Sequence, residues 1–402
     1  MRPEATTTRI RLFRPLTVVA GVLLGFAVLS WAGRTVTQET WYRDFNRFHP
    51  LISPDSHYQP TVAEMCAIVR AQCRPDQILV IVGGNSIFQG VGQPVEKLWT
   101  RRLQELLGDR YAVINLAFRG SSPTDGGALV AEALRREYPH QIYLANVPPF
   151  TAASPIGSTD YRFMLFDAHY KGLLLRHPER DAAIADFLAH PDRYPEAREQ
   201  NLAARADAWL RFRALWNWFS STRAFTFPTP LTPEPGRAFQ PRQAFADREP
   251  DFETLPWSDR FPARALALET EITRNTSIKY YVPTPDGGWK LNDFEQQQFR
   301  KFALAAFPES LRSRTLIVVS RNSPHYVRQL SAAEQARDDL AYRDTVAAWR
   351  ALGFPATEYG ADFEPEDFGD RTHLAASGGR KLAGIIAPEI RRIAAQLGHP
   401  NP

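Results

Sequence analysis

A serine and an aspartate–histidine pair, near opposite ends of the 402-residue chain, are the residue types that nucleophilic catalysis requires. Ser86 lies in Gly-Gly-Asn-Ser-Ile-Phe-Gln-Gly, just after the apolar run 78–82. Asp370 and His373 are three residues apart in Gly-Asp-Arg-Thr-His. In a serine triad the histidine accepts the serine proton, and the carboxylate orients the imidazole. We therefore expect Ser86 to be the nucleophile, His373 the base and Asp370 the orienting acid.

Each of these motifs also has an ordinary structural interpretation. A glycine-flanked serine after a strand is common in turns, and Asp-x-x-His can be a loop whose aspartate caps a helix. His325 follows another predicted strand and is a rival base or, like Asn322, a possible substrate contact. We expect Asp125 to cap the helix that follows it.

Short apolar runs alternate with helical patterns in two parts of the chain. The runs that we expect to form strands are residues 78–82, 111–117, 141–147, 315–320 and 356–359. The helical patterns cover residues 61–73, 95–107, 125–137, 332–352 and 377–397. Continuous apolar strands that alternate with helices are typical of a parallel sheet covered on both faces. The sequence therefore predicts an α/β fold with a parallel sheet sandwiched by helices.

Residues 151–313 break this alternation and indicate a large insertion over the edge of the sheet. Helices are predicted at 181–188 and 196–219, followed by the proline-rich run 227–236. The second helix carries four aromatic residues on one face: Trp209, Phe212, Trp216 and Phe219. This face either packs on the core of the domain or binds a membrane surface or a partner.

The N-terminal region has the pattern of a membrane anchor. An apolar stretch over residues 16–33 follows a basic segment, residues 1–15, that holds Arg2, Arg9, Arg11 and Arg14. About 18 helical residues span roughly 27 Å, close to the thickness of the hydrocarbon core. The arginines predict a cytoplasmic N-terminus and an exported remainder. A cleaved signal peptide, with Ser30-Trp31-Ala32 as the cleavage site, is the alternative, and it also exports the rest of the chain.

Composition bears on the class of partner, and the cysteine positions bear on a disulfide and on metal binding. The hydrophobic share of 44% is that of a globular protein, and the net charge of +4 is scattered, which argues against a nucleic-acid partner. Cys66 and Cys73 lie on the helix that the capping box Thr61-x-x-Glu64 predicts, and they can pair only if that helix ends before Cys73. No Cys/His cluster has metal-ligand spacing, so we expect neither a metal nor a cofactor.

At four positions the sequence resembles the SGNH (GDSL-like) hydrolase family. Residues 84–90 resemble its first block, Gly-Asp-Ser-x-x-x-Gly, with Asn85 in place of the aspartate. The last block, Asp-x-x-His, matches Asp370 and His373. The second block resembles residues 115–122, with Gly120 as an oxyanion donor, and the third is represented only by Asn146.

The resemblance implies an SGNH-like catalytic domain over residues 75–402, after a stalk and first helix at 34–74. It also implies an oxyanion hole made by the N–H groups of Ser86 and Gly120 and the amide of Asn146. The anchored layout is similar to that of the D-alanyl-transfer protein of teichoic acid modification and of periplasmic acyltransferases of polysaccharide O-acetylation. That similarity implies a multispanning membrane-bound O-acyltransferase as partner.

We expect a single-pass protein of the inner membrane with a periplasmic catalytic domain. It would act as a serine acyltransferase or acylesterase on an ester of an envelope glycan or of a lipid carrier. From another class, the alternative is a non-catalytic partner that binds glycan or holds an envelope-modifying complex together.

Overall fold

Five parallel strands form the central sheet of the computed structural model, which describes residues 6–35, 45–48, 51–53, 56–57, 60–151, 154–213, 215, 217 and 249–399. The strands are β3 (Ile78–Val82), β4 (Tyr111–Asn115), β5 (Ile142–Val147), β8 (Thr315–Ser320) and β9 (Ala356–Tyr359). Their order is β4-β3-β5-β8-β9, and each neighbouring pair is parallel. The predicted α/β fold with a parallel sheet is therefore confirmed.

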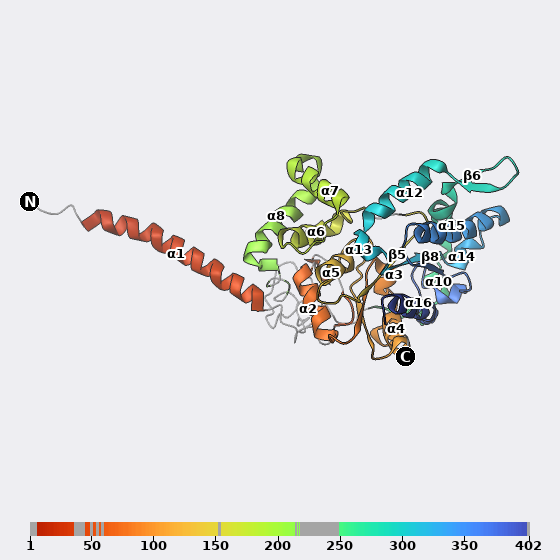
Figure 1. The fold of residues 1–402 in the computed structure, drawn as a ribbon, viewed down its shortest axis with the longest axis horizontal. Helices are drawn as coiled ribbons and strands as arrows, with labels where there is room; N and C mark the ends of the chain where they lie inside the picture. The colour runs from red at the N-terminus through yellow and green to blue at the C-terminus, as the bar shows by residue number, and fades with distance from the viewer. Residues whose placement is uncertain are drawn as a thin grey trace, which may run out of the picture.

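Helices cover both faces of this sheet, as predicted (Figure 1). Leu79 and Ile81 of β3 belong to the core under α2 (Val62–Gln72), α5 (Gly127–Ala133) and α15 (Ala332–Ala351). The alternate residues Val80 and Val82 belong to the core under α4 (Trp99–Leu107) and α16 (Ala376–Gln396). Because side chains alternate along a strand, one apolar run supplies both cores.

The strand order determines where the loops of a site can meet. The first strand of the sheet, β3, lies between the second, β4, and the third, β5. The chain therefore passes from β3 to β4 on one side of it and then crosses to β5 on the other side. Ligands of such sheets bind beyond the carboxyl ends of the strands at the position where the strand order reverses. The loops after β3, β4, β8 and β9 all begin at this edge.

The described part of residues 151–313 adds no strand to the central sheet. It contains α6 (Arg162–Tyr170), α7 (Pro178–Ala189), α8 (Pro195–Leu210), α10 (Trp257–Arg260), α11 (Leu266–Ser277), the hairpin β6 (Tyr281–Pro283) and β7 (Trp289–Leu291), α12 (Asp293–Ala306) and α13 (Glu309–Arg312). Figure 1 shows α6, α7 and α8 grouped at the end of the molecule that faces α1 (Thr6–Thr35). The remaining short elements are β1 (Leu51–Ser53), β2 (Ser56–His57), α3 (Ser86–Gln89) and α14 (Pro324–Val327).

Two predicted helix boundaries were wrong. The helix predicted over 196–219 ends at Leu210, because Arg211 has a left-handed φ of 54°. Trp216, Phe219 and the proline-rich run lie outside the described residues. The helix predicted from residue 95 begins as a short 3-10 turn and becomes α4 only at Trp99.

Asp125 was also wrongly predicted to cap the next helix. The N-cap of α5 is Gly126, without a side-chain hydrogen bond. The carboxylate of Asp125 instead accepts hydrogen bonds from the Ser122 N–H at 2.7 Å and the Ser158 hydroxyl at 2.8 Å. It therefore joins the loop after β4 to the start of the segment after β5.

The capping box of α2 is confirmed. The Glu64 N–H donates to Thr61 Oγ1 at 3.1 Å, and the Thr61 N–H donates to Glu64 Oε2 at 2.8 Å. The helix ends at Gln72, with Cys73 as its C-cap. Cys66 and Cys73 are both free and buried, and burial raises the pKa of each thiol to about 12.

Helix α1 contains a 21-residue segment, Pro15–Thr35, with a mean hydropathy of 2.0. This segment is long and apolar enough to cross a membrane, and its large apolar side chains are mostly exposed. Figure 1 shows α1 extending away from the sheet, with α8 beside its C-terminal end.

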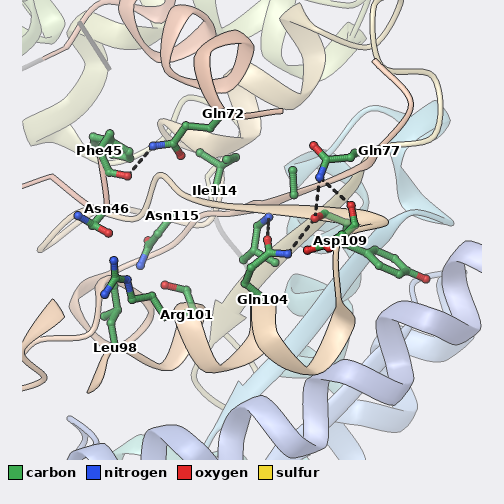
Figure 2. A pocket seen from close by; sticks show the side chains of 14 residues that line it. Phe45, Asn46, Gln72, Gln77, Leu98, Arg101, Gln104, Asp109, Ile114 and Asn115 are labelled. Carbon is green, nitrogen blue, oxygen red and sulfur yellow. Dashed lines mark hydrogen bonds between the residues drawn. The ribbon is translucent and has the colours of Figure 1, made fainter. Parts of the chain in front are cut away.

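The outer edge of the sheet, along β4, is covered by glutamine side chains (Figure 2). Gln104 accepts from the Val113 N–H at 2.9 Å and donates to the Tyr111 carbonyl at 2.9 Å. Gln77 donates to the Asp109 carbonyl at 2.8 Å. A cavity of about 350 Å³ lies along this edge, and none of the predicted site residues lines it. The glutamines take the hydrogen bonds that an added strand would otherwise form.

Candidate active site

The loop that carries Ser86 depends on glycines at two positions. Gly84 has a φ of +100°, and a Cβ there would lie 2.1 Å from Asn146 Oδ1, so the position accommodates only glycine. Ser86 is the first residue of α3, where Asn85 Oδ1 accepts from the Ile87 N–H at 3.0 Å. Gly90 ends the helix in the left-handed conformation. The turn thus places the half-buried Ser86 directly beyond the carboxyl end of β3.

His373 lies between Ser86 and Asp370 in one chain of hydrogen bonds. His373 Nε2 is 2.8 Å from Ser86 Oγ, and His373 Nδ1 is 2.6 Å from Asp370 Oδ2. The second carboxylate oxygen, Asp370 Oδ1, accepts the N–H groups of Thr372 and His373, each at 2.8 Å. The three residues predicted from two distant motifs are therefore brought together, in the order that a triad requires.

The surroundings of Asp370 keep its carboxyl ionised. Burial alone would raise its pKa, but the hydrogen bond and charge of His373 and the N–H groups of His373 and Thr372 outweigh burial. The pKa of Asp370 is accordingly lowered from its ordinary value. An ionised Asp370 favours the tautomer with a proton on Nδ1, which leaves Nε2 free to accept the proton of Ser86.

Arg371 fixes the loop between Asp370 and His373. Its Nε donates to Glu269 Oε2 of α11 at 2.8 Å, and its Nη1 donates to Asn322 Oδ1 at 2.6 Å. The carbonyl of Arg371 accepts from the Ser323 N–H at 2.7 Å. The loop after β8 and a helix from residues 151–313 therefore both hold the histidine loop in place.

The two predicted substrate contacts lie in the loop after β8 but do not touch Ser86. Asn322 is 4% exposed, and its amide donates to the Tyr342 hydroxyl at 3.3 Å. His325 packs against the rings of Phe261 and Trp257, with centroids 4.7 and 5.4 Å away. Burial, with a smaller contribution from a neighbouring arginine charge, lowers the pKa of His325. His373 is the histidine that contacts the serine, and a substrate role for either residue stays a prediction.

Gly120 lies on a loop that is tied to the serine loop. The Phe118 N–H and the Ser121 hydroxyl both donate to the Gly84 carbonyl, at 3.0 and 2.5 Å. Gly120 itself is exposed, with a φ of +72°. Within the part of the chain that the structure describes, neither the Gly120 N–H nor the Ser86 N–H donates a hydrogen bond. Both groups are thus available to an oxyanion.

Asn146 lies at the end of β5 under the serine loop and is 1% exposed. Its Nδ2 donates to Asn85 Oδ1 at 2.9 Å, and its Oδ1 accepts from the Asn85 N–H at 3.2 Å. A weaker contact joins Nδ2 to Ser320 Oγ at 3.5 Å. Asn146 therefore positions the residue before Ser86, and its role as an oxyanion donor stays a prediction.

A segment that no sequence pattern predicts crosses between the serine and histidine loops. The Phe252 N–H donates to the Gly92 carbonyl at 3.0 Å, and its ring fills the space where Gly92 and Gly369 lack side chains. Glu249 accepts from the Gly92 N–H at 3.2 Å and pairs with the guanidinium of Arg119, next to Gly120. No local pattern marks Phe252 or Glu249, since their partners are far away in the sequence.

Comparison with known proteins adds no family to this description. No protein-family model matches the sequence, and no curated protein matches it. In the site itself, a serine, a histidine and a carboxylate form one hydrogen-bonded chain at the carboxyl edge of a parallel sheet.

Proposed function

We propose that this protein is a membrane-anchored serine acyltransferase or acylesterase of the SGNH type, with its catalytic domain on the periplasmic side of the inner membrane. The observation that carries the proposal is the chain of contacts from Asp370 through His373 to Ser86, at 2.6 and 2.8 Å. The apolar segment of α1 supports the anchor.

The reaction proceeds through an acyl-serine. His373 Nε2 takes the Ser86 proton as Oγ attacks the ester carbonyl, and the N–H groups of Ser86 and Gly120 stabilise the oxyanion. Collapse breaks the ester bond, and the leaving alcohol receives the proton from His373. A hydroxyl group or water then attacks the acyl carbon and gives its proton to His373, which returns it to Ser86 as the product leaves.

The substrates that fit this arrangement are esters at the outer surface of the membrane. A nucleophile held beside the bilayer is suited to an acyl donor that arrives through the membrane, and a freely diffusing esterase gains nothing from an anchor. We therefore propose an envelope glycan or a lipid carrier as substrate, and a multispanning membrane-bound O-acyltransferase as the partner that supplies the acyl group.

A fluorophosphonate probe tests the nucleophile and its base. The wild-type protein should be labelled, and Ser86→Ala should not be. His373→Ala should slow labelling by several orders of magnitude, because the serine loses its base. His325→Ala is the matched control and should be labelled at the wild-type rate. Equal labelling of wild type and Ser86→Ala, or loss of labelling in His325→Ala alone, would contradict the proposed triad.

Product analysis separates transfer from hydrolysis. The purified protein is given a chromogenic acyl ester with and without an envelope oligosaccharide. A transferase should place the acyl group on the oligosaccharide, and an esterase should release free acid in both reactions. Binding of the oligosaccharide without any turnover or labelling would instead favour the non-catalytic scaffolding partner.

A further inference from the structure

Helix α1 packs against the end of α8 at three points. The rings of Phe26 and Phe212 stack with centroids 5.7 Å apart. The Ser30 hydroxyl donates to the Trp209 carbonyl at 3.4 Å. A Cβ at Gly33 would lie 2.3 Å from the Arg211 carbonyl oxygen, so the backbones approach closely there. Residues 26, 30 and 33 lie on one face of α1, and this face is the contact with α8.

These contacts lie within the apolar segment of α1. Phe26 is nine residues before Thr35, the last residue of that segment, or about 13 Å along the helix. Half of the hydrocarbon core of a bilayer is about 15 Å thick. If α1 crosses a membrane, Phe212 therefore meets it at the depth of the outer leaflet.

The outward face of α8 exposes two large apolar side chains near its end. Leu202 is 56% exposed and Trp209 is 77% exposed, and the exposed residues Ala203, Arg205 and Ala206 lie between them. The buried residues of α8 are small or polar: Ala197, Ala204 and Asp207. A helix at a water-exposed surface normally turns its large apolar side chains inward, whereas Leu202 and Trp209 lie outside. Tryptophan is also enriched at the boundary between hydrocarbon and water.

A cavity of about 580 Å³ lies between the two helices. It is lined by Leu29 of α1 and by Phe163, Ala203, Ala206, Asp207, Phe212, Arg213 and Leu215. The two charged residues are engaged elsewhere. Asp207 accepts from Lys171 Nζ at 3.1 Å and from the Arg213 N–H at 2.5 Å, and the Arg213 guanidinium lies 4.7 Å from the ring centroid of Phe163. Carbon therefore makes up most of the remaining wall.

We propose that this cavity holds a hydrocarbon chain of an outer-leaflet phospholipid, and that the end of α8 rests in the bilayer beside α1. Leu29 forms one wall of the cavity and belongs to the apolar segment. With α1 across the membrane, this side of the cavity therefore faces lipid. A chain there removes apolar wall from water, which is favourable in proportion to the area covered. The inference rests on α1 as the membrane anchor of the proposed function and is independent of the catalytic chemistry.

The test uses the full-length protein in vesicles of phosphatidylcholine with bromine on the acyl chains, which quenches nearby tryptophans. The chain has nine tryptophans, so Trp209→Phe identifies the contribution of one. Wild type should lose more emission in brominated vesicles than Trp209→Phe loses. Equal quenching of the two proteins would contradict the placement of α8 in the bilayer.

Occupancy of the cavity is read by native mass spectrometry of the detergent-purified protein. Wild type should carry one co-purified phospholipid, and Ala206→Phe, which fills the cavity, should lose it. Leu188→Phe on α7, at an exposed position that does not line the cavity, should retain it. A wild-type protein without lipid, or lipid retained equally by Ala206→Phe, would overturn the proposal. Fluorophosphonate labelling of the same samples reports the proposed catalytic function separately.

Discussion

The side chains around Ser86 fall into two groups, those that would contact a substrate and those that hold the loops in place. Ser86 and His373 would touch a reacting ester, with the N–H groups of Ser86 and Gly120 as oxyanion donors. The amides of Asn146 and Asn322 each hydrogen-bond to a loop that carries one of these residues. Replacing Asn322 should therefore weaken the hold on the histidine loop, because Arg371 loses one of its acceptors.

Asp125 predicts a pH dependence of folding stability. Burial raises the pKa of this carboxyl from 3.8 to about 6, so between these values the folded state binds more protons than the unfolded state. The free energy of unfolding should therefore fall as pH rises through this window, by about 3 kcal/mol for this group. Asp338, whose pKa burial also raises to about 6, contributes with the same sign.

Denaturant unfolding between about pH 4 and pH 6.5 measures this dependence. Asp125→Asn should reduce the fall in the free energy of unfolding, and Asp76→Asn, at an exposed position, should leave it unchanged. An unchanged slope in Asp125→Asn would show that this carboxyl does not titrate differently in the folded and unfolded states.

Elements from residues 151–313 reach the serine loop and the histidine loop directly. Helix α11 contributes Glu269, which binds Arg371 between the acid and the base. The segment that contains Phe252 lies against Gly92 on the serine side and Gly369 on the histidine side. The part of the chain that interrupts the β-α alternation thus joins the two halves of the site.

Glu269→Ala should slow fluorophosphonate labelling of Ser86 by about tenfold, which corresponds to about 1.4 kcal/mol in the barrier. The physical reason is that Arg371 loses the carboxylate that holds its loop. Glu269→Gln keeps a hydrogen-bond acceptor and should recover part of the rate. Glu271→Ala, on the same helix and paired with Arg274, is the control and should label normally. Wild-type labelling by Glu269→Ala would exclude the positioning role.

Local patterns in the sequence predict the parts of this structure that depend on neighbouring residues. The strands and the capping box of Thr61 follow from apolar periodicity and from a four-residue motif. The triad could be predicted because Asp370 and His373 form one short motif and Ser86 lies in another. The end of α8 could not, since a left-handed arginine such as Arg211 has no sequence signature. The contact between Glu269 and Arg371 has none either, because these residues are 102 positions apart.

At the scale of the whole molecule, α1 packs against the rest of the protein. Its contacts through Phe26, Ser30 and Gly33 attach it to the helices of residues 151–313. The predicted alternative of a signal peptide cleaved at Ser30-Trp31-Ala32 would remove the first two of these contacts. Packing therefore favours an intact chain.

The mature protein should accordingly keep its N-terminal segment. Mass spectrometry of protein extracted from membranes should give the mass of the uncleaved chain. A variant with a known cleavable signal peptide fused before Gly33 provides the mass expected after processing. Recovery of the natural chain at that shorter mass would contradict retention of the anchor.

The separation of Ser86 from His373 along the chain also has a consequence for biosynthesis. The two residues are 287 positions apart, so the serine is made long before its base. At about 5–20 residues per second, this delay is roughly 15 to 60 s. During that time the nascent chain holds Ser86 without the histidine that the proposed triad requires. Under the proposed mechanism, the chain would become reactive only after β9 and the loop that follows it have joined the sheet.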